Sequence, residues 1–375
     1  MNIAFLDSID ENTYGGMEEW IRLVAWGLQK RQNNIFILGR EDSAFLKRIH
    51  KENKDLTLIP LNIGGDFNPL TISNIKGILS DNNIDILSVN FTKDIRLGGL
   101  AARFKGDIKV VWSVGLNITK NSFIHKVLTP HLIDGVIVPS ASLKKQITQY
   151  NYIKENDVKV IPIGIPDINF DDLKLSARSE LRNQYHLSQN SIIALTVGRF
   201  VNQKGHIYLI DAAGEIVKKY PQVVFMLLGD GPLENQLKLK VEKLNLSQHF
   251  VFAGMLNDLT NYWAGADLMI HPSVEEPFGI AVLEGMRAGL PIVASRVGGI
   301  PEVVKENETA LLISPKDSSS LATAVMKLLD DSPLLKKLGE EGRKRYERYF
   351  TYQKMIDEVE EYFNSVLKTN KKIYS

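Results

Sequence analysis

The sequence predicts an α/β protein made of two doubly wound domains, each a parallel sheet with helices on both faces. Three observations support this prediction. Short apolar runs alternate with longer segments of helical period almost to the end of the chain, as in chains that form parallel sheets. The alternation breaks once, over residues 162–177, and then restarts. The length of 375 residues exceeds that of an ordinary domain and suits two.

The first domain is predicted to comprise residues 1–165. Its predicted strands are 3–6, 35–38, 56–60, 84–89, 108–114, 135–138 and 158–161. The segments between them have helical period. In 16–30, for instance, Trp20, Leu23, Val24 and Leu28 fall on one helical face.

The second domain is predicted to comprise residues 170–350. Pro162 and Pro166 precede it, and its first helix is predicted at 178–185. Its predicted strands are 192–197, 223–228, 250–253, 268–271, 292–294 and 310–313. A last helix is predicted at 352–367, and its apolar positions 355, 356, 359 and 363 need another part of the chain to cover them.

The composition excludes several classes of protein. The net charge is +1, so the chain lacks the excess of basic residues of a nucleic-acid-binding protein. It contains no cysteine, which excludes disulfides and cysteine-ligated metals. The first residues enter a strand-like run, and no long apolar segment follows. We therefore expect a cytoplasmic protein, with peripheral contact with the inner membrane surface as a further option.

The richest group of polar residues follows the predicted strand 268–271. In doubly wound sheets, ligands bind at the carboxyl ends of the strands. Glu276 lies in the loop after this strand, a helix is predicted to begin near Gly279, and Glu284 lies inside that helix. A helix N-terminus attracts phosphate. Carboxylates accept charge-assisted hydrogen bonds from sugar hydroxyls. The loop therefore combines features that suit a phosphorylated sugar.

Two cations, Arg199 and Lys204, follow the predicted strand 192–197. Two positive charges at one strand end suit a diphosphate and stabilise charge on a leaving nucleotide. The Gly-Lys-Ser/Thr order of a Walker A loop is absent here. In the first domain, Gly15 and Gly16 stand before the helix predicted at 16–30 and offer another close approach of backbone to a ligand.

Together with Gly298-Gly299, these motifs occur in the order and spacing found in a known family. The chain resembles the retaining, metal-independent glycosyltransferases of family four (glycosyl transferases group 1), which have the GT-B fold. The resemblance extends over residues 2–367 and is strongest over 191–315. It implies two Rossmann-like domains facing across a cleft, with the acceptor on the first and the nucleotide-sugar on the second. It also implies that the C-terminal helix, within 352–375, packs back on the first domain.

The resemblance also implies roles for individual residues. Glu276, Lys204 and Arg199 would be the catalytic residues. Glu276 would contact the hydroxyls of the donor sugar, and Glu284 those of the ribose. Arg199 and Lys204 would hold the diphosphate, and Gly298-Gly299 would flank the sugar. The donor site would be completed by Gly15, Gly16, Gly254, Met255, Phe278, Gly279 and Ile280.

The chain departs from the family in its first domain. Members often carry a histidine after the fifth strand and another after the fourth, where this chain has Gly115 and Asn90. We expect Gly115 to leave a gap of side-chain size near the donor sugar, filled by Asn117 or by the acceptor, and to help set donor choice. Asn90, Gly115, Asn117 and His125 are the acceptor-side candidates.

The predicted function is therefore that of a retaining hexosyltransferase that uses a nucleotide-sugar, UDP-hexose above all. The acceptor would be a glycan, a lipid-linked molecule or a small molecule, in polysaccharide or glycoconjugate synthesis. Neither a metal nor a cofactor is expected, because cations and helix N-termini supply the positive field. In such a mechanism the leaving phosphate accepts the proton of the acceptor.

Other interpretations remain open. A nucleotide-sugar 2-epimerase of the same fold would need several histidines and carboxylates in its cleft, which the sequence does not supply. A nicotinamide-dependent dehydrogenase would need a Gly-any-Gly-any-any-Gly turn after the first strand, which residues 7–16 lack. A non-catalytic nucleotide-sugar-binding protein is a third interpretation. His271 is expected to pack in the core, and His206 to lie on a helix surface.

Overall fold

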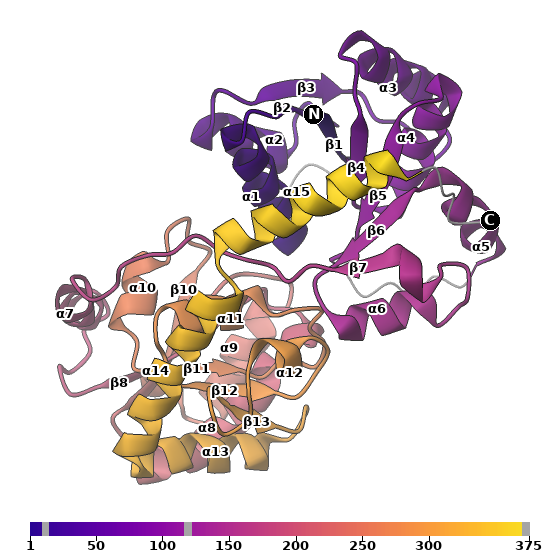
Figure 1. Cartoon of the computed structure of the whole chain (residues 1–375). Coiled ribbons are helices and arrows are strands. Elements are labelled where there is room, and N and C mark those ends of the chain that lie inside the picture. The colour runs from indigo at the N-terminus through magenta and orange to yellow at the C-terminus, as the bar shows by residue number, and fades with distance from the viewer. Residues whose placement is uncertain (10–14, 116–121, 370–375) are drawn as a thin grey trace. The chain divides into compact units, whose positions relative to one another are not determined.

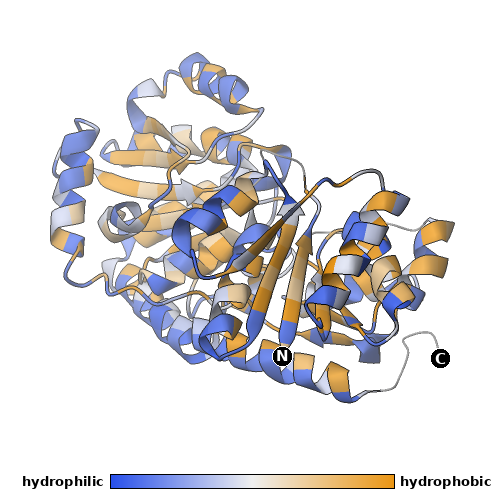
Figure 2. Cartoon of the chain, turned by 90° about the horizontal axis from the view of Figure 1, so that it is seen from above, coloured by the Kyte–Doolittle hydropathy of each residue, from blue (hydrophilic) through white to orange (hydrophobic). Residues whose placement is uncertain are grey.

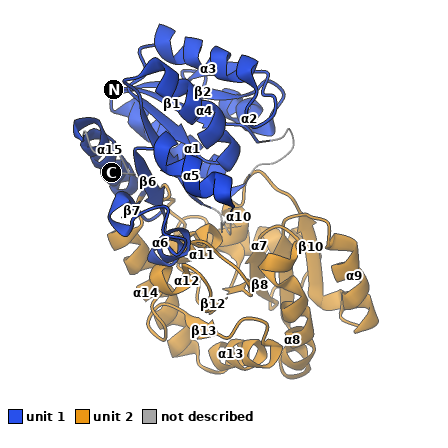
Figure 3. Cartoon of the chain, turned by 90° about the vertical axis from the view of Figure 1, so that its right-hand side faces the viewer, with its two compact units in different colours: residues 1–164, 352–375 blue, residues 165–351 orange. Residues whose placement is uncertain are grey.

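The computed structural model describes residues 1–9, 15–115 and 122–369. The chain separates into two compact units (Figure 3). Unit 1 comprises Met1–Gly164 together with Tyr352–Ser375, and unit 2 comprises Ile165–Thr351. Each unit contains one sheet whose paired strands all run parallel. The predicted fold class, two doubly wound α/β units, is confirmed.

Unit 1 holds a seven-stranded sheet in the order β3-β2-β1-β4-β5-β6-β7 (Figure 1). Its strands are β1 (Asn2–Asp7), β2 (Asn34–Arg40), β3 (Thr57–Leu61), β4 (Ile86–Val89), β5 (Lys109–Ser113), β6 (Gly135–Val138) and β7 (Val158–Val160). Its helices are α1 (Gly16–Lys30), α2 (Ala44–Glu52), α3 (Pro69–Asp81), α4 (Thr92–Lys105), α5 (Phe123–Leu132), α6 (Ala141–Thr148), the short 3₁₀ helix η1 (Glu155–Asp157) and α15 (Tyr352–Lys368).

Side chains alternate between the two faces of this sheet, as in any strand. Trp112 in β5 belongs to the core that the sheet forms with α3 and α4. The next residue, Ser113, instead lines a small hollow together with Met17 and Trp20 of α1. Helix α1 therefore covers the face of the sheet opposite to α3 and α4.

The final helix, α15, packs against α1 within unit 1 (Figure 1). Its apolar positions predicted to need cover are buried: Met355, Ile356, Val359 and Phe363. Gly27 of α1 permits the close contact, because a Cβ at that position would lie 2.5 Å from side-chain carbons of Ile356. The Tyr352 hydroxyl also donates a hydrogen bond to the Leu23 carbonyl at 2.9 Å.

Unit 2 holds a six-stranded sheet in the order β10-β9-β8-β11-β12-β13. Its strands are β8 (Ile192–Val197), β9 (Val223–Leu228), β10 (Phe250–Gly254), β11 (Leu268–His271), β12 (Ile292–Ser295) and β13 (Leu311–Ile313). Its helices are α7 (Lys174–Gln184), η2 (Asn202–Lys204), α8 (His206–Lys219), α9 (Glu234–Lys243), η3 (Ser247–His249), α10 (Thr260–Gly265), α11 (Ile280–Arg287), α12 (Ile300–Val303), α13 (Ser318–Asp330) and α14 (Ser332–Tyr349).

The central strands of both units are apolar along most of their length, while the helices carry both apolar and polar positions (Figure 2). This is the pattern of parallel sheets covered on both faces. None of the described helices combines the length and the apolar character needed to cross a lipid bilayer.

Candidate active site

The loops after β8 and β11 lie side by side at the carboxyl edge of the unit 2 sheet, because these strands are neighbours. Gly205 permits close packing of the two loops. Its φ is +67°, and a Cβ there would lie 2.0 Å from the carbonyl oxygen of Pro272. The Val274 amide also donates to the Gln203 carbonyl at 2.7 Å. Backbone packing therefore fixes the loops against each other.

The side chain of Glu276 links these two loops. Its Oε2 accepts hydrogen bonds from Lys204 Nζ at 2.6 Å, His271 Nε2 at 2.9 Å and Ser273 Oγ at 3.4 Å. Among the described residues, no group donates a hydrogen bond to Oε1. One oxygen of the carboxylate is therefore held in place, and the other remains available to a ligand.

The surroundings of Glu276 keep it ionised. Burial by itself would raise the pKa of this carboxyl, but the charge of Lys204 and the hydrogen bond from His271 outweigh it and lower the pKa to about 2. An ionised carboxylate can only accept hydrogen bonds. Glu276 is therefore suited to bind hydroxyl groups.

Arg199 supplies a second positive charge near this loop pair. It follows Gly198 at the end of β8, its side chain is exposed, and it has no side-chain partner among the described residues. Lys204 differs, since its ammonium group is already bound to Glu276. A bound anion can therefore pair with Arg199 without breaking an existing ion pair.

Helix α11 begins next to Glu276. Its N-cap, Gly279, has φ +106°, where a side chain is strained, and a Cβ would lie 2.4 Å from Ile300 Cδ1. The first amide groups of a helix have no partner within the helix and carry partial positive charge. The N-terminus of α11, at Gly279 and Ile280, therefore adds to the positive field of Arg199 and Lys204.

Gly298 and Gly299 support this arrangement through the backbone. Gly298 has φ +49°, and a Cβ there would lie 1.9 Å from the Glu276 carbonyl oxygen. The Gly299 amide donates to the same oxygen at 3.0 Å. Gly298 and Gly299 therefore hold the backbone of Glu276 in place.

The other donor-site candidates in unit 2 fall into two groups. Glu284 is half-buried in the second turn of α11, and Gly254 with the exposed Met255 lies at the carboxyl end of β10. Phe278, by contrast, is buried and packs its ring on Phe350, with the ring centroids 6.1 Å apart. The Phe278 ring therefore supports the loop from inside.

In unit 1, Gly15 and Gly16 form the start of α1. Gly15 is the N-cap residue, Gly16 is the first helical residue, and the Gly15 amide donates to Glu18 Oε2 at 2.7 Å. Part of the backbone at this helix start is therefore already bonded within the unit.

The described acceptor-side candidates of unit 1 lie on separate elements. Asn90 is buried just after β4, and its side-chain amide donates to the Leu6 carbonyl at 3.3 Å. His125 is buried in α5, with its Nε2 at 3.3 Å from a guanidinium nitrogen of Arg96. Asn117 lies outside the described residues.

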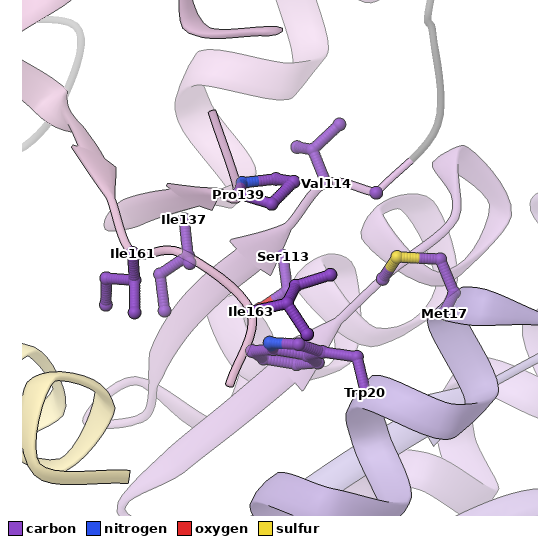
Figure 4. A pocket seen from close by; sticks show the side chains of 9 residues that line it. Met17, Trp20, Ser113, Val114, Ile137, Pro139, Ile161 and Ile163 are labelled. Carbon is purple, nitrogen blue, oxygen red and sulfur yellow. The ribbon is translucent and has the colours of Figure 1, made fainter. Parts of the chain in front are cut away.

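The prediction that Gly115 leaves a gap of side-chain size, for Asn117 or the acceptor to fill, is wrong. A Cβ at Gly115 would lie 1.8 Å from the sulfur of Met17, so the Met17 side chain already occupies that space. Figure 4 shows Met17 extending from α1 toward the end of β5, near Trp20 and Ser113. The volume that a histidine would take at position 115 is filled from within unit 1 itself.

One histidine differs from the prediction, and a second is buried as predicted but makes a further contact. His206 is buried rather than on the helix surface, packed edge-on against Phe200 with centroids 5.0 Å apart. Burial, with His271 and Lys204 nearby, lowers its pKa to about 3. His271 is buried as predicted, yet its ring also holds Glu276 in place. This contact forms within β11 and the loop that follows it, and it depends on how that loop folds back.

Two protein-family models match this chain. The family model described as glycosyl transferases group 1 matches residues 177–345, and the model described as Glycosyltransferase Family 4 matches residues 14–167. An uncharacterized glycosyltransferase of Methanocaldococcus jannaschii is 33% identical over 57% of this chain and 56% of its own length. The chain thus matches little more than half of that relative.

Two further proteins match over more of the chain. The Escherichia coli UDP-Gal:α-D-GlcNAc-diphosphoundecaprenol α-1,3-galactosyltransferase is 27% identical over 76% of each chain. The crystal structure of Anabaena HepE in complex with UDP and glucose superposes with a TM-score of 0.83 and 24% identity, covering 97% of this chain and all of HepE. With its two doubly wound units and both family matches, the chain belongs to the group 1 glycosyltransferases, enzymes of the GT-B fold.

Proposed function

We propose that this glycosyltransferase moves a hexose from a UDP-sugar to an acceptor hydroxyl and retains the configuration of the anomeric carbon. The observation that carries the proposal is the state of Glu276. It is buried and ionised, with one oxygen tied to Lys204 and the other free of hydrogen bonds within the described structure. A carboxylate held in this way suits a ligand that brings hydroxyl groups.

The donor's diphosphate would lie beside Arg199, Lys204 and the N-terminus of α11. These groups present positive charge at the same edge of the sheet. A planar guanidinium, an ammonium and free helix amides together suit the oxygens of a diphosphate. We therefore propose that transfer needs no metal ion, because the protein itself stabilises the leaving group.

In the proposed reaction, the bond between the anomeric carbon and the diphosphate oxygen breaks while the acceptor oxygen bonds to the same face of that carbon. The acceptor's proton passes to an oxygen of the leaving diphosphate. The negative charge that develops on the diphosphate is stabilised by Arg199 and Lys204. Such a step balances without a protein base or an added reactant.

The names of the relatives support the choice of substrates. The Escherichia coli relative is named for UDP-galactose and a lipid-linked acceptor, and HepE was crystallised with UDP and glucose. We propose UDP-hexose as the donor of this chain, and a glycan, a lipid-linked sugar or a small hydroxyl compound as its acceptor.

A panel assay tests the proposal. The wild type would be incubated with UDP-glucose, UDP-galactose, UDP-N-acetylglucosamine, UDP-glucuronate and GDP-mannose, each with and without candidate acceptors, and free nucleotide would be measured. Release from a UDP-sugar is expected. Glu276→Gln should abolish it, while Glu275→Gln, at the exposed neighbouring residue, should not. An epimerised nucleotide-sugar without transfer, or binding without any turnover, would overturn the proposal.

A further inference from the structure

A second hollow lies in unit 2, at the opposite edge of the sheet from the candidate active site. It borders the turn between α11 and β12, the start of α7, and one face of α14, and its volume is about 710 Å³. A hollow of this size accommodates a molecule as large as a sugar phosphate. The functional roles described above do not involve it.

The carboxylates that line this hollow already have cationic partners. Asp171 pairs with Lys174, Asp267 with Arg178 and Arg182, Glu340 with Lys336, and Glu347 with Arg343. Their negative charges are therefore balanced by neighbours. A bound anion would not face an unpaired carboxylate among the described lining residues.

Arg287 differs from the paired cations of the hollow. It is 7% exposed, and its Nη1 donates to the Pro166 carbonyl at 2.8 Å. Its guanidinium also lies over the ring of Phe170, 5.7 Å from the centroid. Among the described residues it forms no ion pair within 4.0 Å, although the charges of Glu284 and Asp167 favour its ionised form from farther away. Its buried Nε has no hydrogen-bond partner. A buried donor without an acceptor is costly, and a charged one more so.

An anion with oxygen acceptors would supply the hydrogen-bond partner that Arg287 Nε lacks. A guanidinium presents its Nε and Nη donors as a fork that matches two oxygens of a phosphoryl group. A neutral sugar would offer oxygens without a negative charge in direct contact with the guanidinium, which Glu284 and Asp167 favour only from beyond ion-pair distance. The chemistry of the hollow therefore favours a phosphorylated small molecule.

This hollow is also connected to the candidate active site through a single helix. Arg287 is the last residue of α11, and the N-cap of the same helix, Gly279, adjoins Glu276. Eight residues at the usual helical rise span only about 12 Å. A ligand that fixes Arg287 thereby acts on the end of the element whose start faces the proposed donor.

We propose that the hollow at Arg287 is a binding site for a phosphoryl group, separate from the donor site, and that its occupation changes the affinity for the UDP-sugar through α11. The binding site does not depend on the proposed function. The effect on the donor rests on it, so the two are measured separately.

Binding would be measured by titration calorimetry with inorganic phosphate and with glucose 1-phosphate, both in saturating UDP so that the cations of the donor site are occupied. Glucose serves as the neutral control. We expect both phosphates, and not glucose, to bind the wild type. Arg287→Met should weaken binding at least about tenfold, since charged hydrogen bonds to phosphate are worth more than ~1.4 kcal/mol.

Two further variants keep the test decisive if Arg287→Met folds poorly. Arg287→Lys retains the charge but loses the fork, and should also weaken binding. Lys344→Ala removes an exposed cation from the rim, with a side chain 66% exposed, and its partner Glu341 is not among the lining residues. It should change affinity less than about twofold. Equal losses of affinity for the Lys344 and Arg287 variants, or no binding by the wild type, would overturn the site.

The effect on the donor has its own readout, the KM for the UDP-sugar with and without glucose 1-phosphate. We expect a shift in the wild type that Arg287→Lys reduces. Phosphate binding with an unchanged KM would refute the connection through α11 while leaving the site intact. Failure of the proposed function would show instead as no turnover of any nucleotide-sugar.

Discussion

Replacing Lys204 by methionine should destabilise unit 2 through Glu276, and the structure gives the size of the effect. The pKa of Glu276 is lowered from 4.5 to about 2. Since one pKa unit corresponds to ~1.4 kcal/mol, ionised Glu276 contributes about 3 kcal/mol to folding at neutral pH. Burial opposes ionisation, and Lys204 is the strongest of the groups that favour it. We expect Lys204→Met to cost roughly 2–4 kcal/mol at pH 7.

The pH dependence identifies the source of this loss. A carboxyl whose pKa is lowered by folding stabilises the protein above its ordinary pKa, and this contribution disappears as the pH falls through the folded value. For Glu276 the window runs from 4.5 down to about 2. The difference between wild type and Lys204→Met should therefore shrink by roughly half or more between pH 7 and pH 3.

Scanning calorimetry at both pH values would measure the loss, because the two units can unfold in separate transitions. Lys219→Met provides the matched control, since Lys219 forms an ion pair with Asp330 in which both side chains are about half exposed. It should have little effect at either pH. Equal effects of the two substitutions, or a Lys204→Met effect that is the same at pH 3, would refute the electrostatic explanation.

Three further predictions follow from the contacts described. Gly115→Ala should destabilise unit 1 by about 1–3 kcal/mol in urea denaturation, because Met17 fills the space. In a Met17→Ala background, where that side chain is absent, the further cost of Gly115→Ala should be much smaller; full stability of Gly115→Ala alone would contradict the contact. Gly298→Ala should reduce turnover strongly, because the added Cβ displaces the backbone of Glu276. Gly214→Ala should not, since an added Cβ there meets nothing within 4 Å. Equal turnover in these two variants would refute the role of Gly298. Transfer should survive EDTA, and complete loss restored by magnesium or manganese would refute the metal-free proposal.

Much of the fold follows from local patterns in the sequence. The strand Ile192–Val197 and the helix that starts after Gly279 agree with the predicted positions, because apolar runs between turn residues mark buried parallel strands. The pairing of strands is a separate matter. The pairing of β8 with β11, for example, joins residues more than 70 positions apart, such as Ala194 and Leu268, and it brings Lys204 to Glu276.

The sequence predicts only part of the candidate site, because some of its contacts also depend on how the chain folds. Glu276 and Lys204 stand out because polar residues follow apolar strands. The contact of His271 with Glu276 depends on how the loop folds back, and a buried histidine in a strand resembles an ordinary core residue. The burial of His206 depends on Phe200, and the filling of the space at Gly115 depends on Met17 from another element. Such contacts leave no periodic pattern in the sequence.

The central claim is that the carboxyl edge of the unit 2 sheet holds the nucleotide part of the donor. Titration calorimetry of UDP with the wild type and Arg199→Ala tests it most directly. Arg199 is exposed and has no partner within the described structure, so its loss should leave the fold unchanged. We expect UDP to bind the wild type and to bind Arg199→Ala at least about tenfold more weakly. Equal affinity for UDP in the two proteins would contradict the claim.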